Sequence, residues 1–211
     1  MRSSLLRMTI PVAKLVLFSG KLGYILPDYT KINHGLYVDL FVPSEVTWNQ
    51  GGEEVKIVQT TAYPESETTS LAIQTKKRAR FSLRLRVPGW GQGATLELNG
   101  AKLDVACRPG AWAKVERDWD PGDRVAFRIP MQLKLTPVDK RHPNLIALAY
   151  GPVVLVQSQE SSSLPVPSDF SKWLVPGERP LAFRSEWKTK GIFEPFYRTK
   201  FGIPYRMYFR V

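Results

Sequence analysis

Apolar residues recur with two different periods along the chain, which predicts one helix followed by many strands. Over residues 11–26 apolar side chains are spaced three and four apart, between Pro11 and Pro27, so we predict one amphipathic helix there. From residue 35 onward apolar and polar residues mostly alternate, which is typical of half-buried strands. Residues 145–149 and 153–156 are instead nearly continuous apolar runs, which fit strands buried on both faces. We expect strands at 35–42, 54–61, 70–75, 80–87, 94–99, 102–105, 112–117, 124–129, 131–136, 145–149, 153–156 and 205–211.

Turn signals separate these strands at intervals of about 8–12 residues, as an antiparallel sandwich requires. The strongest is Asn99-Gly100, since a type I′ hairpin needs a positive φ at both central positions. The predicted fold class is therefore all-β, an antiparallel β-sandwich of jelly-roll type preceded by one orphan amphipathic helix.

The pattern divides the chain into four segments. Residues 1–34 carry the helix, whose apolar stripe needs a cover: it packs on the sheet edge or is the remnant of a preceding helical domain. Residues 35–157 form the predicted β-sandwich. Residues 158–180 are rich in Ser and Pro and predict a long surface loop or linker. The aromatic-rich residues 181–211 predict strands that return to the sandwich or extend it.

The formal charge of +11 raises the question of a polyanionic partner. The densest basic run begins at Lys76 and continues through Arg84 and Arg86. Its arginines alternate with Phe81, Leu83 and Leu85, which indicates that the arginines lie on the solvent-exposed face of a strand. No row of aromatic residues on which bases could stack accompanies these arginines. We therefore expect no specific nucleic-acid partner, and rank a basic nucleic-acid-binding domain last among the candidates.

Few residues of the chain are candidates for catalysis or metal binding. The single cysteine, Cys107, excludes an internal disulfide and a thiolate-rich zinc site in this chain, and the two histidines, His34 and His142, lie far apart. Asp118 and Asp120 could bind a cation, although such a pair is usually a solvated turn. The other acidic residues considered fall mostly in turns or on solvent faces: Glu45, Glu53, Glu54, Glu65, Glu67 and Asp123. We assign no catalytic, cofactor-binding or metal residue.

Targeting signals are equally weak. The apolar run at residues 15–18 is too short for the core of a signal peptide, and no stretch reaches the length of a membrane span. We expect no membrane association, and a cytoplasmic location by default.

Several motifs resemble the C-terminal part of glycoside hydrolase family 127, the β-L-arabinofuranosidase-like proteins. Their order and spacing carry the resemblance over residues 11–211. They are Gly35-Leu36-Tyr37-Val38-Asp39-Leu40-Phe41-Val42-Pro43-Ser44-Glu45, Phe81-Ser82-Leu83-Arg84-Leu85-Arg86-Val87-Pro88-Gly89-Trp90, Gly122-Asp123-Arg124-Val125, Ile129-Pro130-Met131-Gln132-Leu133, Ala149-Tyr150-Gly151-Pro152-Val153-Val154, Phe193-Glu194-Pro195-Phe196-Tyr197 and Tyr205-Arg206-Met207-Tyr208-Phe209.

The resemblance implies an upstream helical barrel that carries the chemistry, with a zinc-bound cysteine nucleophile, further cysteine ligands and a glutamate. A paired-cysteine motif should precede the last barrel helix, which the predicted helix at residues 12–26 resembles. The corresponding place, Met8-Thr9-Ile10-Pro11, contains no cysteine, and Cys107 matches no family ligand. We therefore carry over no catalytic residue and expect zinc only in the missing barrel, whose reaction would be release of terminal L-arabinofuranose.

The sequence thus favours a non-catalytic β-sandwich region that supports a β-L-arabinofuranosidase-type barrel, supplied in cis or in trans. The alternative is a stand-alone carbohydrate-binding module that recognises an arabinose-containing glycan. Such a module would stack sugars on exposed tryptophan rings, although tryptophans in small sandwiches more often cap the core. The chain has six tryptophans: Trp48, Trp90, Trp112, Trp119, Trp173 and Trp187. No carbohydrate-binding residue can be assigned among them from the sequence.

Overall fold

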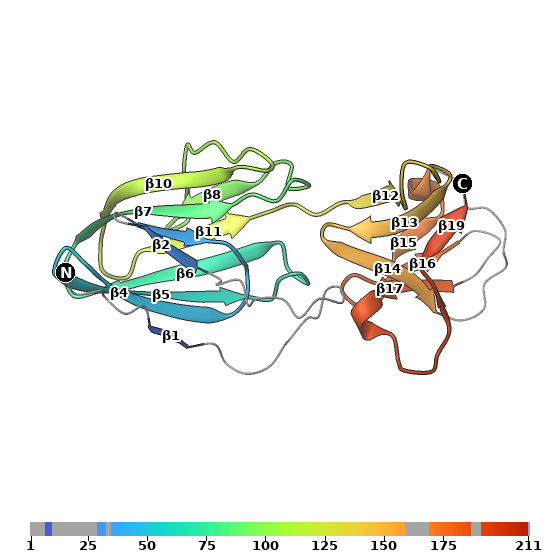
Figure 1. The fold of residues 1–211 in the computed structure, drawn as a ribbon, viewed down its shortest axis with the longest axis horizontal. Coiled ribbons are helices and arrows are strands. Elements are labelled where there is room, and N and C mark those ends of the chain that lie inside the picture. Colours follow the sequence, from blue (N-terminus) through green and yellow to red (C-terminus); the bar gives the residue numbers. More distant parts are fainter. Residues whose placement is uncertain (1–6, 10–28, 33–34, 159–168, 187–190, 211) are drawn as a thin grey trace. The chain divides into compact units, whose positions relative to one another are not determined.

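The structure is a computed structural model that describes residues 7–9, 29–32, 35–158, 169–186 and 191–210 (Figure 1). Apart from two single-turn 3-10 helices, every regular element of these residues is a strand, so the predicted all-β class is confirmed. The amphipathic helix predicted at residues 11–26 lies outside the described residues, as do His34 and Trp187.

The chain divides into two compact units, Met1–Pro130 and Met131–Val211. We had placed the end of the sandwich at residue 157, whereas the division falls before the strands of residues 133–158. Those strands pair with strands further along the chain, and this pairing makes them part of the second unit. The two units are described separately below.

The first unit consists of two sheets. The larger has the order β1(Arg7–Thr9), β4(Ser44–Gln50), β5(Glu53–Thr61), β6(Thr68–Thr75), β11(Arg124–Arg128), β8(Thr95–Leu98) and β9(Ala101–Lys102). The smaller has the order β10(Trp112–Trp119), β7(Ala79–Arg86), β3(Gly35–Val38) and β2(Tyr29–Ile32).

A single apolar core joins these two sheets, so the predicted sandwich is confirmed for this unit. Trp48 of β4 and Phe81 of β7 meet edge to face across the core at 5.2 Å between ring centroids. Phe81 also stacks on Trp119 of β10 at 5.4 Å. The inward positions of β7, Phe81, Leu83 and Leu85, are almost completely buried, as the alternation predicts.

The predicted hairpin at Asn99-Gly100 is confirmed, because both residues have positive φ, 51° and 85°. By contrast, the strand predicted over 35–42 ends at Val38. Beyond it, the carbonyl oxygens of Leu40 and Val42 accept hydrogen bonds from Nε2 of Gln59 at 3.0 and 2.6 Å, so a side chain takes the place of a neighbouring strand. The strand β4 was not predicted at all.

One strand pair departs from the antiparallel pattern. The strands β3 and β7 run parallel, with Tyr37 opposite Arg84 and Gly35 opposite Ser82. A Cβ at Gly35 would collide with the backbone carbonyl of Ser82, so only glycine permits this approach.

The second unit is built on one branched sheet around its own core, which includes Trp173, Phe193 and Phe209. Part of the stretch predicted as a loop at 158–180 is regular structure here, because Trp173 and Leu174 are buried. Its elements are β12(Leu133–Pro137), β13(Leu145–Tyr150), β14(Val153–Ser158), η1(Phe170–Lys172), β15(Leu174–Pro176), β16(Phe183–Ser185), β17(Gly191–Pro195), η2(Phe196–Arg198), β18(Tyr205–Arg206) and β19(Tyr208–Arg210).

Candidate binding surface on the first unit

The outer face of the smaller sheet gathers most of the polar side chains that the sequence singled out. Alternation along β7 points Arg80, Arg84 and Arg86 away from the core, as predicted for the basic run. On β10 the exposed residues are Trp112, Lys114, Glu116 and Asp118. The antiparallel register places these two series in rows: Trp112 beside Arg86, Lys114 beside Arg84, Glu116 beside Ser82 and Asp118 beside Arg80.

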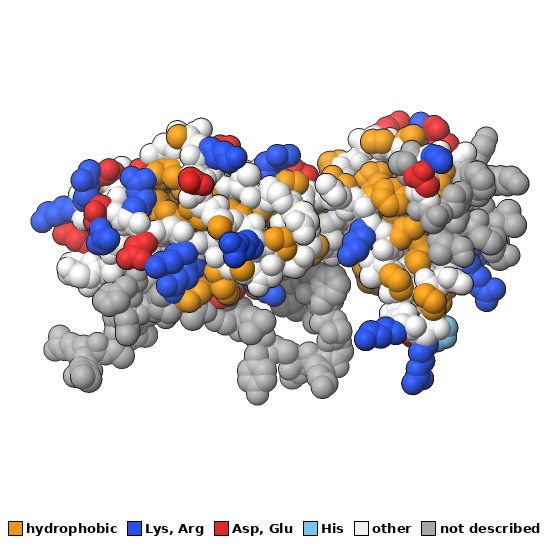
Figure 2. Space-filling view, turned by 90° about the horizontal axis from the view of Figure 1, so that it is seen from above, with side chains coloured by type: hydrophobic (Ala, Val, Ile, Leu, Met, Phe, Trp, Pro, Cys, Tyr) orange, Lys and Arg blue, Asp and Glu red, His pale blue; other side chains and the backbone are white. Residues whose placement is uncertain are grey.

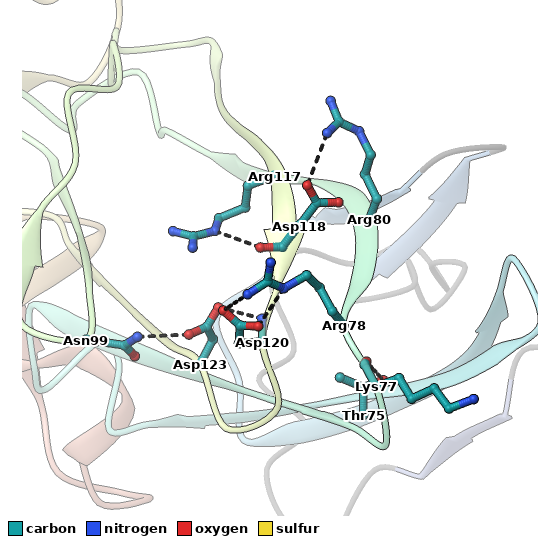
Figure 3. Close-up of polar contacts among 9 residues, drawn as sticks. All are labelled: Thr75, Lys77, Arg78, Arg80, Asn99, Arg117, Asp118, Asp120 and Asp123. Carbon is teal, nitrogen blue, oxygen red and sulfur yellow. Dashed lines mark hydrogen bonds and ion pairs between the residues drawn. The ribbon is translucent and has the colours of Figure 1, made fainter.

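At one end of this face, arginines form ion pairs with aspartates (Figure 3). Arg78 binds Asp120 through both carboxylate oxygens, with Nε to Oδ1 at 2.7 Å and Nη2 to Oδ2 at 3.1 Å. The hydrogen bond from Arg78 lowers the pKa of Asp120. Arg80 approaches Asp118 at 3.4 Å. The two aspartates that could have bound a cation are therefore neutralised by arginines.

The adjoining turn depends on a buried carboxylate. Asp123 accepts hydrogen bonds from Nδ2 of Asn99 at 2.8 Å and from the backbone N–H of Asp120 at 3.0 Å. Its side chain therefore braces the turn after β10 against the Asn99 hairpin (Figure 3). This carboxylate has a structural role, since Asn99 and Asp120 both belong to turns.

The other end of the face combines aromatic rings with arginines. Tyr37 and Trp112 meet edge to face, with centroids 4.6 Å apart and planes at 81°. Arg84 donates to the hydroxyl of Tyr37 at 2.7 Å, and its guanidinium carbon lies 4.9 Å from the Tyr37 centroid. Trp112 is 38% exposed. Three strands, β3, β7 and β10, thus contribute side chains to one aromatic and basic end, which we call the Trp112 end.

Charge is distributed unevenly between the two ends. Lys114 binds Glu116 at 2.6 Å, and Arg80 and Arg78 have their aspartates. Within the described part of the chain, Arg84 and Arg86 have no carboxylate partner. The arginines of this face that form no ion pair with a carboxylate therefore lie at the Trp112 end. The hydrogen bond from Lys114 lowers the pKa of Glu116, and the charge of Arg84 also contributes to this lowering.

The residues considered for catalysis do not converge. Cys107 is half-buried, its Sγ lies 3.5 Å from the carbonyl oxygen of Val105, and burial raises the pKa of its thiol, which disfavours the thiolate. His142 is exposed in the second unit and pairs with Asp139 in the same turn. Among the described residues no three His, Cys, Asp or Glu side chains gather as a metal site, so the residues present do not fit the zinc centre of the family's barrel.

The remaining acidic candidates of the first unit are mostly bound to basic side chains. Glu45 pairs with Lys56 at 2.7 Å, Glu53 with Lys77 at 3.7 Å and Glu67 with Arg128 at 2.9 Å. Glu54 and Glu65 lie at exposed positions. None of these carboxylates faces another across a cleft in the described residues, as a pair of glycosidase carboxylates would.

The tryptophans separate into core and surface. Trp48, Trp119 and Trp173 are buried, Trp90 is half-buried, and Trp112 is exposed. In the sequence, Trp48 and Trp90 adjoin turns, which would favour exposure of their rings. The exposed ring is instead Trp112, which could be recognised only from its opposite phase to Trp119 on β10: the two are seven residues apart on an alternating strand.

The second unit has a different kind of surface. On the face seen in Figure 2, hydrophobic side chains gather on this unit, whereas basic and acidic side chains are interspersed over the first unit. The large apolar residues exposed along its last strands and turns are Ile192, Phe196, Tyr197, Phe201, Ile203, Tyr205 and Tyr208. No helix of the described residues is both long and apolar enough to cross a membrane.

These features define a class: two all-β units, the first a sandwich, with no catalytic constellation assembled in the residues described. Comparison with known proteins identifies the relatives. Residues 35–131 match the family model described as the middle domain of GH127 β-L-arabinofuranosidases. The resemblance to part of glycoside hydrolase family 127 is thereby confirmed, and the matched stretch corresponds to a non-catalytic part of those proteins.

Solved structures agree with this. A GH127 β-L-arabinofuranosidase from Geobacillus stearothermophilus T6 is similar over 87% of this chain, with 25% identity and a TM-score of 0.69. A protein described as a glycoside hydrolase matches 86% of the chain at 21% identity and a TM-score of 0.70. A further GH127 β-arabinofuranosidase matches 87% at 16% identity and 0.67. The chain covers only 35–36% of each of these structures. No match was found among curated proteins.

Proposed function

We propose that this chain is a β-sandwich region that supports a β-L-arabinofuranosidase-type catalytic barrel carried by another part of a longer protein or by a separate polypeptide. The observation that carries the proposal is the match of residues 35–131 to the middle domain of that family. Because the solved relatives are nearly three times as long as the region this chain covers, there is room in them for a further catalytic domain.

The charge pattern of the first unit supports this role. The carboxylates of Asp118, Asp120 and Glu116 are each bound by a basic side chain, and Asp123 braces a turn. Such groups stabilise a sandwich but do not form the acid and nucleophile pair of a glycosidase. The reaction is therefore proposed for the barrel, together with its zinc.

The apolar surface of the second unit supplies a place where a barrel could dock. Phe201 is fully exposed, and Phe196 and Tyr205 form an edge-to-face pair at 5.3 Å with 41% and 45% of their surfaces open. Exposed apolar patches of this kind typically mark protein contacts. We propose that the helices of the catalytic barrel cover this surface.

An activity comparison tests the proposal. The recombinant 211-residue chain is assayed on a β-L-arabinofuranoside beside protein immunopurified from the cells that make it, with an antibody to the first unit. We expect hydrolysis and bound zinc only in the immunopurified material. Hydrolysis by the recombinant chain, or none in either sample, would argue against a supporting role.

The alternative function, a carbohydrate-binding module that acts on its own, is favoured by one observation. Trp112 is exposed beside Tyr37, and polar groups lie alongside both rings. Glycan binding by a native protein that has neither a barrel of its own nor a partner chain would favour this alternative over the supporting role.

A further inference from the structure

We propose that the Trp112 end of the first unit binds an acidic saccharide, a glycan that carries a uronate carboxylate. The site consists of Tyr37 on β3, Arg84 and Arg86 on β7, and Trp112 on β10. It does not depend on a catalytic barrel, since all four residues belong to this chain, and it is separate from the apolar surface of the second unit.

The rings supply the stacking surface. Trp112 is 38% exposed, while the other described tryptophans are buried or half-buried. Its edge-to-face contact with Tyr37 fixes the orientation of both rings before any ligand arrives. An aromatic ring held in this way offers its face to the C–H groups of a sugar at little cost in side-chain entropy.

The arginines supply the charge. Arg84 is already held by the hydroxyl of Tyr37 at 2.7 Å, so its guanidinium is positioned, not mobile. Arg86 lies in the same row as Trp112. In the described residues neither has a carboxylate partner, whereas Arg78, Arg80 and Lys114 on the same face each have one. A guanidinium without a protein carboxylate is complementary to the carboxylate of a ligand.

The size of the site favours a saccharide over a nucleic acid. The face continues from the Trp112 end into Glu116 and Asp118, whose carboxylates would repel a phosphate backbone that followed the strands. The basic run thus has only one aromatic pair and a short uncompensated stretch. That suits one or two sugar rings, whereas a nucleic-acid strand needs successive stacking positions along a continuous basic groove.

Binding is tested by isothermal titration calorimetry of the recombinant chain with four probes at one ionic strength: tri-galacturonate, a neutral arabino-oligosaccharide, a sulfated oligosaccharide and a short oligothymidylate. We expect tri-galacturonate to bind most tightly and its affinity to fall as salt rises. Equal or tighter binding of the neutral sugar or the sulfated sugar would overturn the uronate assignment. Tighter binding of the oligothymidylate would overturn it in favour of a nucleic-acid site. Absence of tri-galacturonate binding at millimolar concentration would also overturn it.

Two variants locate the site, and a third is the matched control. Trp112→Ala and Arg86→Gln should each weaken tri-galacturonate binding by about tenfold or more, since a charge-assisted hydrogen bond or a stacked ring contributes on that order. Arg80→Gln removes the same charge from the same face of the same strand, but its partner is Asp118. It should change the affinity less than about twofold, because an exposed, paired charge contributes little. Equal losses in Arg80→Gln and Arg86→Gln would show a diffuse charge effect and contradict the site. A cooperative thermal unfolding transition verifies that each variant folds.

Discussion

At the scale of single residues, the two tryptophans of β10 have opposite roles. Trp119 is fully buried, stacks on Phe81 and donates its Nε1–H to the carbonyl oxygen of Phe81 at 3.0 Å. Trp112 lies on the other face of the same strand and is exposed. Substitution of Trp119 therefore tests core packing, and substitution of Trp112 tests surface chemistry on the same strand.

The stability of the first unit should distinguish these residues. Trp119→Ala leaves a large cavity and removes the hydrogen bond to the carbonyl oxygen of Phe81, so we expect it to lower the free energy of unfolding by about 3–5 kcal/mol. Trp112→Ala should cost about 1 kcal/mol or less, since its ring lies outside the core and is already 38% exposed. Urea unfolding followed by far-UV circular dichroism measures both. Similar losses in the two variants would contradict the placement of the two rings.

Tyr63 gives a prediction that depends on pH. Burial raises the pKa of its phenol from 10.0 to about 12, and the charge of Arg86 opposes this shift. The folded pKa lies above the unfolded one, so this group contributes stability that is complete below about pH 10 and is lost as the pH rises towards 12. An absorbance titration at alkaline pH should show one late-titrating tyrosine that disappears in Tyr63→Phe. If Tyr63→Phe leaves the titration curve unchanged, Tyr63 is not buried as described.

At the scale of elements, alternation along the sequence predicted most of the strands of the first unit and the Asn99-Gly100 hairpin. It could not predict how distant strands pair. The parallel contact of β3 with β7 brings Tyr37 beside Arg84, and the antiparallel contact of β10 with β7 brings Trp112 beside Arg86. The sequence therefore identified the outward arginines but not the aromatic pair that completes the Trp112 end, because that pair depends on non-local register.

The division into units escaped prediction for a similar reason. The strands of residues 133–158 include the nearly continuous apolar runs at 145–149 and 153–156, and these runs do not indicate which core they join. Only their pairing with β17, β18 and β19 assigns them to the second unit. The strand β4 was missed because one of its three buried positions is the polar Ser44, so that only Val46 and Trp48 carry its apolar alternation.

The β3–β7 contact can be tested at Gly35. Gly35→Ala places a methyl group against the carbonyl of Ser82, so the strands must separate. We expect a loss of about 1–3 kcal/mol, typical of overpacking, and faster hydrogen exchange in β3. Gly89→Ala is the control, because its Cβ would meet no atom within 4 Å and its φ is not in the positive region. Equal stability of the two variants would contradict the parallel pairing.

At the scale of the whole molecule, the two units have surfaces of different character. The first unit carries the ion-paired and aromatic sheet face, and the second exposes apolar rings along its last strands and turns. We propose that the first surface binds sugar and that the second binds the catalytic barrel. An apolar surface without its partner should associate with copies of itself.

Sedimentation of the recombinant chain tests that consequence. We expect concentration-dependent self-association, reduced by the combined change Phe196→Ser, Phe201→Ser and Tyr205→Ser, because it removes exposed rings of one surface. Val138→Ser, an exposed apolar position of the same unit directly after β12, is the control and should have little effect. A chain that remains monomeric at about 100 µM would contradict the docking role of this surface.

The central claim is that this β-sandwich region works as the support of a catalytic barrel. The most direct test is the mass of the protein isolated from the cells that make it, measured intact by native and by denaturing mass spectrometry. Our account predicts either one polypeptide well above 24.0 kDa or a stoichiometric complex with a second, zinc-containing chain. A native species of 24.0 kDa without any stoichiometric partner would contradict it.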